Sequence, residues 1–281
     1  APAAAAPAAP EGQAAAPAAA ATEWQVVHAT VDHSIARTFS DALGDDGPAV
    51  SAEYARLFVW DVDMQRDLLK GDAIAVIWRK VGEDYQIAAA TLTSGKKGEL
   101  RAYRFQAPGD VHPSFWRADG TEVPFRLVDG PLESYEQVTS LLKDRPTHKG
   151  MDFKTPVGTP IHAPRAGRVD KTNWNWQFNG NSVELHLDDG VVAKFLHMSA
   201  NHVKPGDHVT KGQVIGLTGN TGRSTAPHLH YQLERGDRIL DPLEYHQTVR
   251  RKMPAAAMAD FTREVQRLDG LFAAAPVKAE P

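Results

Sequence analysis

Short apolar runs separated by glycines fill the second half of this chain, and they restrict its fold more than any other feature. They lie at residues 168–171, 182–187, 191–196, 213–217 and 228–234. Runs of this length with turn residues between them predict β-strands, and we expect an all-antiparallel unit. Residues 148–230 also hold eight of the 12 histidines, so this unit is where we expect the chemistry.

The first half predicts a smaller unit that combines helices with an antiparallel sheet. Apolar residues at four-residue spacing, from Val31 to Leu43, predict a helix that ends at Gly44, and a second helix is expected around residues 51–60. After these helices, the spacing of apolar residues changes from that of a helix to that of a strand. Strands are predicted at residues 73–80, 85–93 and 99–105, followed by a short hairpin around Gly120.

The two ends of the chain differ in composition from the rest. Of the first 22 residues, 18 are Ala or Pro, which predicts a semi-rigid spacer. An apolar stripe near the other end predicts an amphipathic helix; it consists of Phe261, Val265, Leu268 and Phe272. A length of 281 residues suggests two folded domains. We expect a mainly β protein with a spacer over 1–22, an α+β accessory domain over 23–130, a second domain over 131–245 and a C-terminal helix over 246–275.

Composition excludes several classes of function. The chain has 31 Lys and Arg against 35 Asp and Glu, a net charge of −4, so it has no basic surplus for binding nucleic acid. No apolar run approaches the roughly 18 residues of a membrane span, and no signal-peptide pattern begins at Ala1. The absence of cysteine excludes disulfides, thiolate metal sites and a cysteine nucleophile.

Two histidines in the run 228–233 share one face of a predicted strand. Alternation places Leu229 and Tyr231 in a core and directs His228 and His230 to the other side. Two imidazoles side by side need partners for their ring nitrogens, and a metal ion or a catalytic pairing supplies them. A pair of partly exposed surface histidines remains the alternative.

A second pair of polar residues lies four positions apart at His148 and Asp152. Gly150 and Pro156 argue against a helix, and an extended segment also returns these positions to one face, where they could bind one ion. Two histidines and a carboxylate would leave the fourth position of a tetrahedral zinc open, which is the catalytic arrangement. A surface contact between His148 and Asp152 is the simpler interpretation of this pair alone.

A third histidine, His197, ends an apolar run. Alone it would be a buried strand-end histidine, whereas beside a metal site it becomes a candidate base or oxyanion partner.

These motifs together resemble the lysostaphin/LytM-type zinc endopeptidases of bacterial cell walls, over about residues 134–242. The segments that carry the resemblance are HKGMDF, GTPIHAPRAGRV, NGNSVELH, FLHMS, VKPGDHVTKGQVIGLTGNTG and STAPHLHYQL. The resemblance implies an antiparallel barrel-sandwich-type peptidase domain over 131–245. It makes His148, Asp152 and His230 ligands of one Zn²⁺ ion, and His197 and His228 the paired catalytic imidazoles.

The chain departs from the family pattern at two places. Phe195 stands where a tyrosine is usual, and the stretch 138–146 before His148 is shortened. We expect both changes to affect substrate preference and groove shape more than activity. Residues 58–72 and 101–105 are similar to the N-terminal regions of Gram-negative members, which implies a role in positioning substrate or covering the site; a plain scaffold is the alternative.

The resemblance implies hydrolysis of the peptide crosslinks of peptidoglycan, and the Gram-negative likeness favours the D-Ala to meso-diaminopimelate bond over pentaglycine. We expect an exported monomer in the periplasm or cell envelope that acts on peptidoglycan peptide stems, possesses no transmembrane segment in this chain and binds no nucleic acid. The Ala/Pro segment then becomes a spacer from an export or anchoring point.

Two other functions are open. The chain could be a non-hydrolytic or latent wall-binding regulator of other peptidoglycan hydrolases, although all five expected site positions are filled. Residues 203–213 also resemble the turns of biotinyl and lipoyl carriers. Carriers need an exposed lysine at a hairpin tip, and residues 217–222 contain none.

Overall fold

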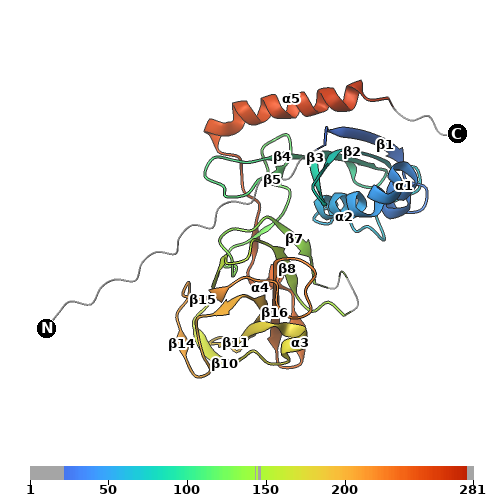
Figure 1. Cartoon of the computed structure of the whole chain (residues 1–281). Coiled ribbons are helices and arrows are strands. Elements are labelled where there is room, and N and C mark those ends of the chain that lie inside the picture. Colours follow the sequence, from blue (N-terminus) through green and yellow to red (C-terminus); the bar gives the residue numbers. More distant parts are fainter. Residues whose placement is uncertain (1–21, 143, 145–146, 277–281) are drawn as a thin grey trace.

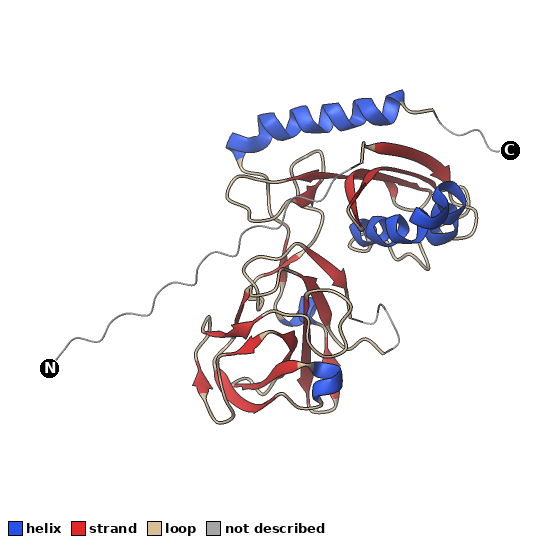
Figure 2. Ribbon diagram, viewed as in Figure 1, coloured by secondary structure: helices blue, strands red, loops and turns tan. Residues whose placement is uncertain are grey.

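A computed structural model describes residues 22–142, 144 and 147–276. The predicted Ala/Pro spacer therefore lies almost wholly outside the described residues. Strands make up most of the regular structure, and every strand pair is antiparallel (Figure 2). The expectation of a mainly β protein is confirmed.

The first half forms a five-stranded sheet in the order β1-β2-β3-β4-β5. Its strands are β1 (Gln25–Thr30), β2 (Ala73–Val81), β3 (Asp84–Ser94), β4 (Gly98–Phe105) and β5 (Ser114–Trp116). One face packs on α1 (Ile35–Leu43) and α2 (Gly47–Phe58), which are joined by the short helix η1 (Gly44–Asp46). The predicted helices and strands are confirmed, except that α2 begins earlier than expected and β1 was not predicted.

The C-terminal helix returns to this first sheet. After the short helix η2 (Ala255–Ala257), helix α5 (Met258–Ala274) packs on the face opposite α1 and α2 (Figure 1). Its predicted apolar stripe is buried, with Phe261 and Leu268 fully inaccessible to solvent. Alternate side chains of β2 point to opposite faces of the sheet. Ile74 and Val76 belong to the core shared with α1 and α2, and Ile77 belongs to the core shared with α5.

The second half forms an open eight-stranded sheet that packs around one apolar core with a three-stranded sheet. The larger sheet has the order β14-β10-β11-β12-β16-β8-β7, with β17 beside β16, and the smaller has the order β13-β15-β9. The larger sheet consists of β7 (Gln137–Ser140), β8 (Met151–Lys154), β10 (Gly167–Thr172), β11 (Asn181–Leu187), β12 (Val192–Met198), β14 (His208–Val209), β16 (His228–Arg235) and β17 (Arg238–Leu240). The smaller consists of β9 (Pro160–His162), β13 (Ala200–Asn201) and β15 (Val214–Leu217).

Short elements complete the fold. Helix α3 (Trp176–Asn179) lies between β10 and β11, and α4 (Pro242–Tyr245) follows β17. Strands β6 (Arg126–Leu127) and β18 (Thr248–Val249) pair with each other where the chain passes between the two halves. The positions predicted for the strands of this half agree with β10, β11, β12, β15 and β16.

Candidate functional site

The predicted alternation along β16 is confirmed. Leu229 and Tyr231 are fully buried in the core, and His230 lies on the opposite face. In the neighbouring strand, Asp152 is the register partner of His230, so the pleat directs both side chains to the same side of the sheet.

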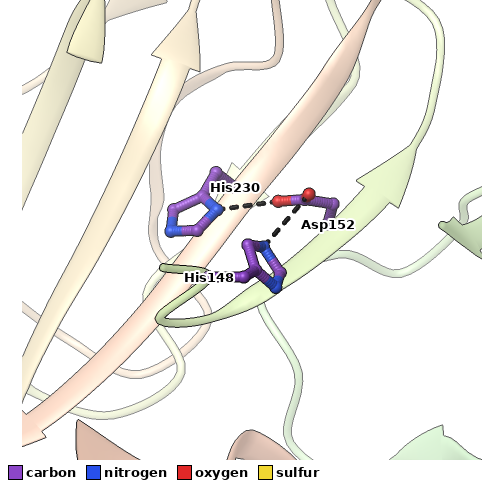
Figure 3. A group of neighbouring side chains, drawn as sticks. All are labelled: His148, Asp152 and His230. Atoms are coloured by element: carbon purple, nitrogen blue, oxygen red, sulfur yellow. Dashed lines mark hydrogen bonds and ion pairs between the residues drawn. The ribbon is translucent and has the colours of Figure 1, made fainter. Parts of the chain in front are cut away.

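His148 reaches the same place from the turn that precedes β8, rather than from an extended strand (Figure 3). Its Nε2 lies 3.1 Å from Asp152 Oδ2, and His230 Nδ1 lies 2.7 Å from Asp152 Oδ1. The three residues offer ligand atoms that all lie within 4.8 Å of one another. The structure therefore brings together the predicted ligand set.

The chemistry of these donors fits a divalent ion such as zinc, which accepts imidazole nitrogen and carboxylate oxygen and keeps a position open in catalytic sites. His148 Nδ1 donates to the carbonyl oxygen of Leu141 at 2.8 Å, which fixes the ring and makes Nε2 the nitrogen that faces Asp152 and could bind a metal. Burial alone would raise the pKa of Asp152, but its hydrogen bonds with His148 and His230 outweigh burial and hold that pKa far below its usual range. The carboxylate is thus ionised.

His197 and His228 form a second pair beside this cluster, with their ring centroids 4.7 Å apart. His197 Nδ1 donates to the carbonyl of Thr221 at 2.9 Å, and His228 Nδ1 to that of Ala226 at 2.8 Å. Each Nδ1 is therefore a donor, and Nε2 is the nitrogen left for other partners. His228 Nε2 lies 4.0 Å from Asp152 Oδ1, so the pair adjoins the candidate metal ligands.

A local distortion of β12 directs His197 to this side. Between Phe195 and Met198, β12 has one residue more than its partner β11, and His197 has a φ of 64°. Strict alternation would have kept His197 on the core face with Phe195. The bulge instead returns Met198 to the core, which leaves His197 facing His228; bulges and left-handed residues of this kind recur at functional sites.

Burial lowers the pKa of His197 to about 4, although its hydrogen bond to Thr221 opposes the shift. The imidazole is neutral at neutral pH, and its Nε2 can accept a proton.

Three further residues were of interest from the sequence: Phe195, His186 and His162. Phe195 is fully buried against Tyr231, with ring centroids 5.3 Å apart. His186 is exposed. His162 bonds through Nδ1 to the Gly212 carbonyl and is not among the clustered ligands.

The sequence patterns did not indicate the loop that orients His197 and His228. Residues 219–226 supply the carbonyls of Thr221 and Ala226, and Ser224 Oγ lies 3.0 Å from His228 Nδ1. The available signal was the Ser-Thr-Ala-Pro stretch directly before His228.

The family model for peptidase family M23 matches residues 146–242. The chain is 32% identical over 197 residues to the peptidoglycan DD-endopeptidase ShyC of Vibrio cholerae, which covers 64% of this chain and 43% of ShyC. It is 30% identical over 227 residues to ShyA of the same organism, which covers 75% of this chain and 51% of ShyA. The chain thus spans about half the length of these relatives.

Among solved structures, the catalytic domain of lysostaphin from Staphylococcus simulans aligns with a TM-score of 0.36 and 32% identity, covering 44% of this chain and 92% of that chain. None of the helices in the described part of the chain combines the length and apolar character that a membrane span requires. The family match falls on the strands and turns that carry the five clustered residues, and the chain therefore carries a peptidase family M23 domain in residues 146–242.

Proposed function

We propose that this chain is a zinc metallo-endopeptidase that hydrolyses peptide crosslinks in bacterial peptidoglycan. One observation carries the proposal: a compact His148, Asp152 and His230 ligand set lies directly beside a second pair of imidazoles, His197 and His228. The likeness to proteins named peptidoglycan DD-endopeptidases supports the substrate class.

A zinc ion held by the three ligands would supply Lewis acidity, which polarises a scissile carbonyl and lowers the pKa of water toward about 7. His197 and His228 each bind a backbone carbonyl through Nδ1, so Nε2 is the nitrogen available to the reacting atoms. One accepts the proton of the attacking water and returns it to the leaving amine. Between these two transfers the same proton, held on this pair of imidazoles, donates a hydrogen bond to the oxyanion.

We also propose the finer details that the motifs implied. The bond is D-Ala to meso-diaminopimelate, the protein acts as a monomer in the periplasm or cell envelope, and residues 23–130 position substrate or cover the site. The relatives ShyC and ShyA, both from Vibrio cholerae, support the Gram-negative crosslink over the pentaglycine bridge.

Metal analysis of the purified protein combined with mass spectrometry of digested crosslinked muropeptides tests the proposal. We expect one zinc per chain and conversion of crosslinked dimers to monomers. Intact crosslinks from a zinc-loaded protein would contradict the proposal. Intact crosslinks together with stimulation of a wall amidase would favour the alternative, a non-hydrolytic regulator.

A further inference from the structure

A stretch of aromatic and amide residues lies next to the loop of the catalytic pair. Residues 173–182 read Asn-Trp-Asn-Trp-Gln-Phe-Asn-Gly-Asn-Ser and contain no charged residue, in a chain that is 23% charged. Within it, Trp176 is 55% and Phe178 is 51% exposed. Among the described residues, they are the only aromatics in the group of exposed large hydrophobic side chains.

The segment is held in place, so this exposure belongs to an ordered surface. Asn173 and Asn175 have φ values of 55° and 50°, a conformation that asparagine tolerates better than most residues. Asn173 Oδ1 accepts from the Ser182 amide at 3.0 Å and from Asn201 Nδ2 at 2.8 Å. Asn179 Nδ2 donates to the Trp174 carbonyl at 3.0 Å. Side-chain amides thus fix the backbone that presents the two rings.

The same segment is fastened to the loop that orients His197. The Arg223 amide donates to the Phe178 carbonyl at 3.0 Å, and the Asn181 amide donates to Thr221 Oγ1 at 2.9 Å. Thr221 also supplies the carbonyl that accepts from His197 Nδ1. A Cβ at Gly180 would lie 2.2 Å from Thr221 Oγ1, so the two backbones are in close contact. The rings therefore have a defined position relative to the catalytic pair.

The chemistry of the surface fits an uncharged, hydroxyl-rich ligand. The C–H face of a sugar ring packs on an aromatic face, whose negative potential attracts polarised C–H groups. Side-chain amides both donate and accept, as hydroxyl and acetamido groups require. A stem peptide carries carboxylates and an ammonium group, which charged partners would recognise. Of the neighbouring cations, Lys171 is paired with Glu184 at 3.0 Å.

We propose that Trp176 and Phe178 form a platform for the N-acetylated sugars of the glycan strand, beside the crosslink that the site cuts. The proposal rests on the proposed function, since it places the sugar next to the peptide substrate. The platform holds the wall so that a stem peptide extends from the sugar toward His197 and His228.

Titration of the full chain with a peptide-free GlcNAc–MurNAc oligosaccharide, followed by NMR or calorimetry, tests the platform without requiring hydrolysis. We expect the Trp176→Ala/Phe178→Ala double variant to bind at least about tenfold more weakly. A Trp176→Tyr/Phe178→Tyr variant, which keeps two rings, should retain most of the affinity. Val249→Ala, which removes an exposed apolar side chain in β18, is the matched control and should bind like the wild type.

Hydrolysis rates on two substrates, one with glycan and one without, then distinguish recognition of the sugar from recognition of the peptide. The alanine double variant should lose at least about tenfold more activity on sacculi than on a glycan-free crosslinked peptide dimer. Equal losses on both substrates would make the rings a peptide subsite and overturn the proposal, as would wild-type protein that does not bind the oligosaccharide. Oligosaccharide binding through the rings by a protein that cuts no crosslink would instead refute the proposed hydrolysis alone.

Discussion

The clustered imidazoles differ in which ring nitrogen is tied to the rest of the protein. His148, His197 and His228 each bond a backbone carbonyl through Nδ1, whereas His230 directs Nδ1 at Asp152. Three of the imidazoles therefore direct Nε2 into the cluster, whereas His230 directs Nδ1 at the Asp152 carboxylate. This difference distinguishes His228 from His230, although they are two residues apart on one strand face.

Alanine variants should separate these two roles. We expect His230→Ala to lose zinc and all hydrolysis, because it removes one of three ligands. His228→Ala should keep zinc and lose about 10²- to 10⁴-fold in turnover, as for loss of a general acid or base. Metal content measured alongside the hydrolysis rate tests both, and stoichiometric zinc in His230→Ala would refute the ligand assignment.

A buried carboxylate, Glu122, links the two halves of the molecule. It is fully inaccessible and accepts hydrogen bonds from Arg251 at 2.8 Å and from Arg126 at 2.7 Å. Burial by itself would raise its pKa, but the two guanidinium groups outweigh burial and lower the pKa to about 2. The ionised pair is therefore the form that the folded state favours.

This lowered pKa predicts acid sensitivity. Glu122 has a lower pKa folded than unfolded, so its stabilisation is present above about pH 4.5 and is lost as the pH falls toward about 2. Glu122→Gln should reduce the free energy of unfolding by about 3 kcal/mol at pH 7, since it removes the carboxylate that Arg126 binds and one of the two carboxylates that Arg251 binds. Denaturant unfolding at several pH values checks this, and a difference from wild type that persists at pH 2 would contradict it.

At the level of elements, the metal ligands depend on how closely the turn before β8 approaches β16. A Cβ added at Gly150 would lie 2.3 Å from the Tyr231 carbonyl oxygen and 3.0 Å from His230 Nε2. Only glycine therefore allows the turn that carries His148 to reach this strand. In the sequence, Gly150 indicated only that this segment is not helical.

Gly150→Ala should therefore weaken zinc binding although it changes no ligand. The turn must move away from β16, and displaced ligands typically reduce metal affinity by about 10- to 100-fold. Competition with a chelator measures this affinity. Gly270→Ala in α5 is the control, because a Cβ there contacts nothing within 4 Å; equal zinc affinity in both variants would show that the close approach is unimportant.

For the whole molecule, the decisive feature is the return of the C-terminal helix to the first sheet. Phe261 is fully buried on that sheet and contacts Phe105 with ring centroids 5.3 Å apart. The chain thus leaves the peptidase half, passes the Glu122 ion pairs and completes the core of the N-terminal half. A truncated chain that begins at Leu132 would lack the first sheet and would expose the apolar face of α5. A truncation that tests the role of the N-terminal half must therefore remove α5 as well.

Removal of the Phe261 ring should destabilise the N-terminal half. We expect Phe261→Ala to lower the free energy of unfolding by about 3–5 kcal/mol, because it leaves a cavity in the core. Phe178→Ala removes the same atoms from a ring that is 51% exposed and should cost about 1 kcal/mol or less. Thermal unfolding compares the two, and similar shifts would mean that α5 contributes little to the core.

The sequence alone determined the strands β2, β3, β4, β10, β11, β12, β15 and β16, the apolar stripe of α5 and the pairing of His228 with His230 on one face. Each follows from a local period of two or about 3.6 residues, which the order of residues carries directly. The motif resemblance led to His148, Asp152 and His197 by position. Residues 143 and 145–146, in the stretch expected to be shortened, lie outside the described part of the chain.

Only the tertiary structure decided how these pieces meet. The bulge that turns His197 out of the core, the carbonyl of Thr221 that orients His197, and the sheet that receives α5 all depend on contacts between residues far apart in the chain. A local pattern shows which face of a strand or helix is apolar, but not which partner covers it. That choice depends on packing of the whole chain.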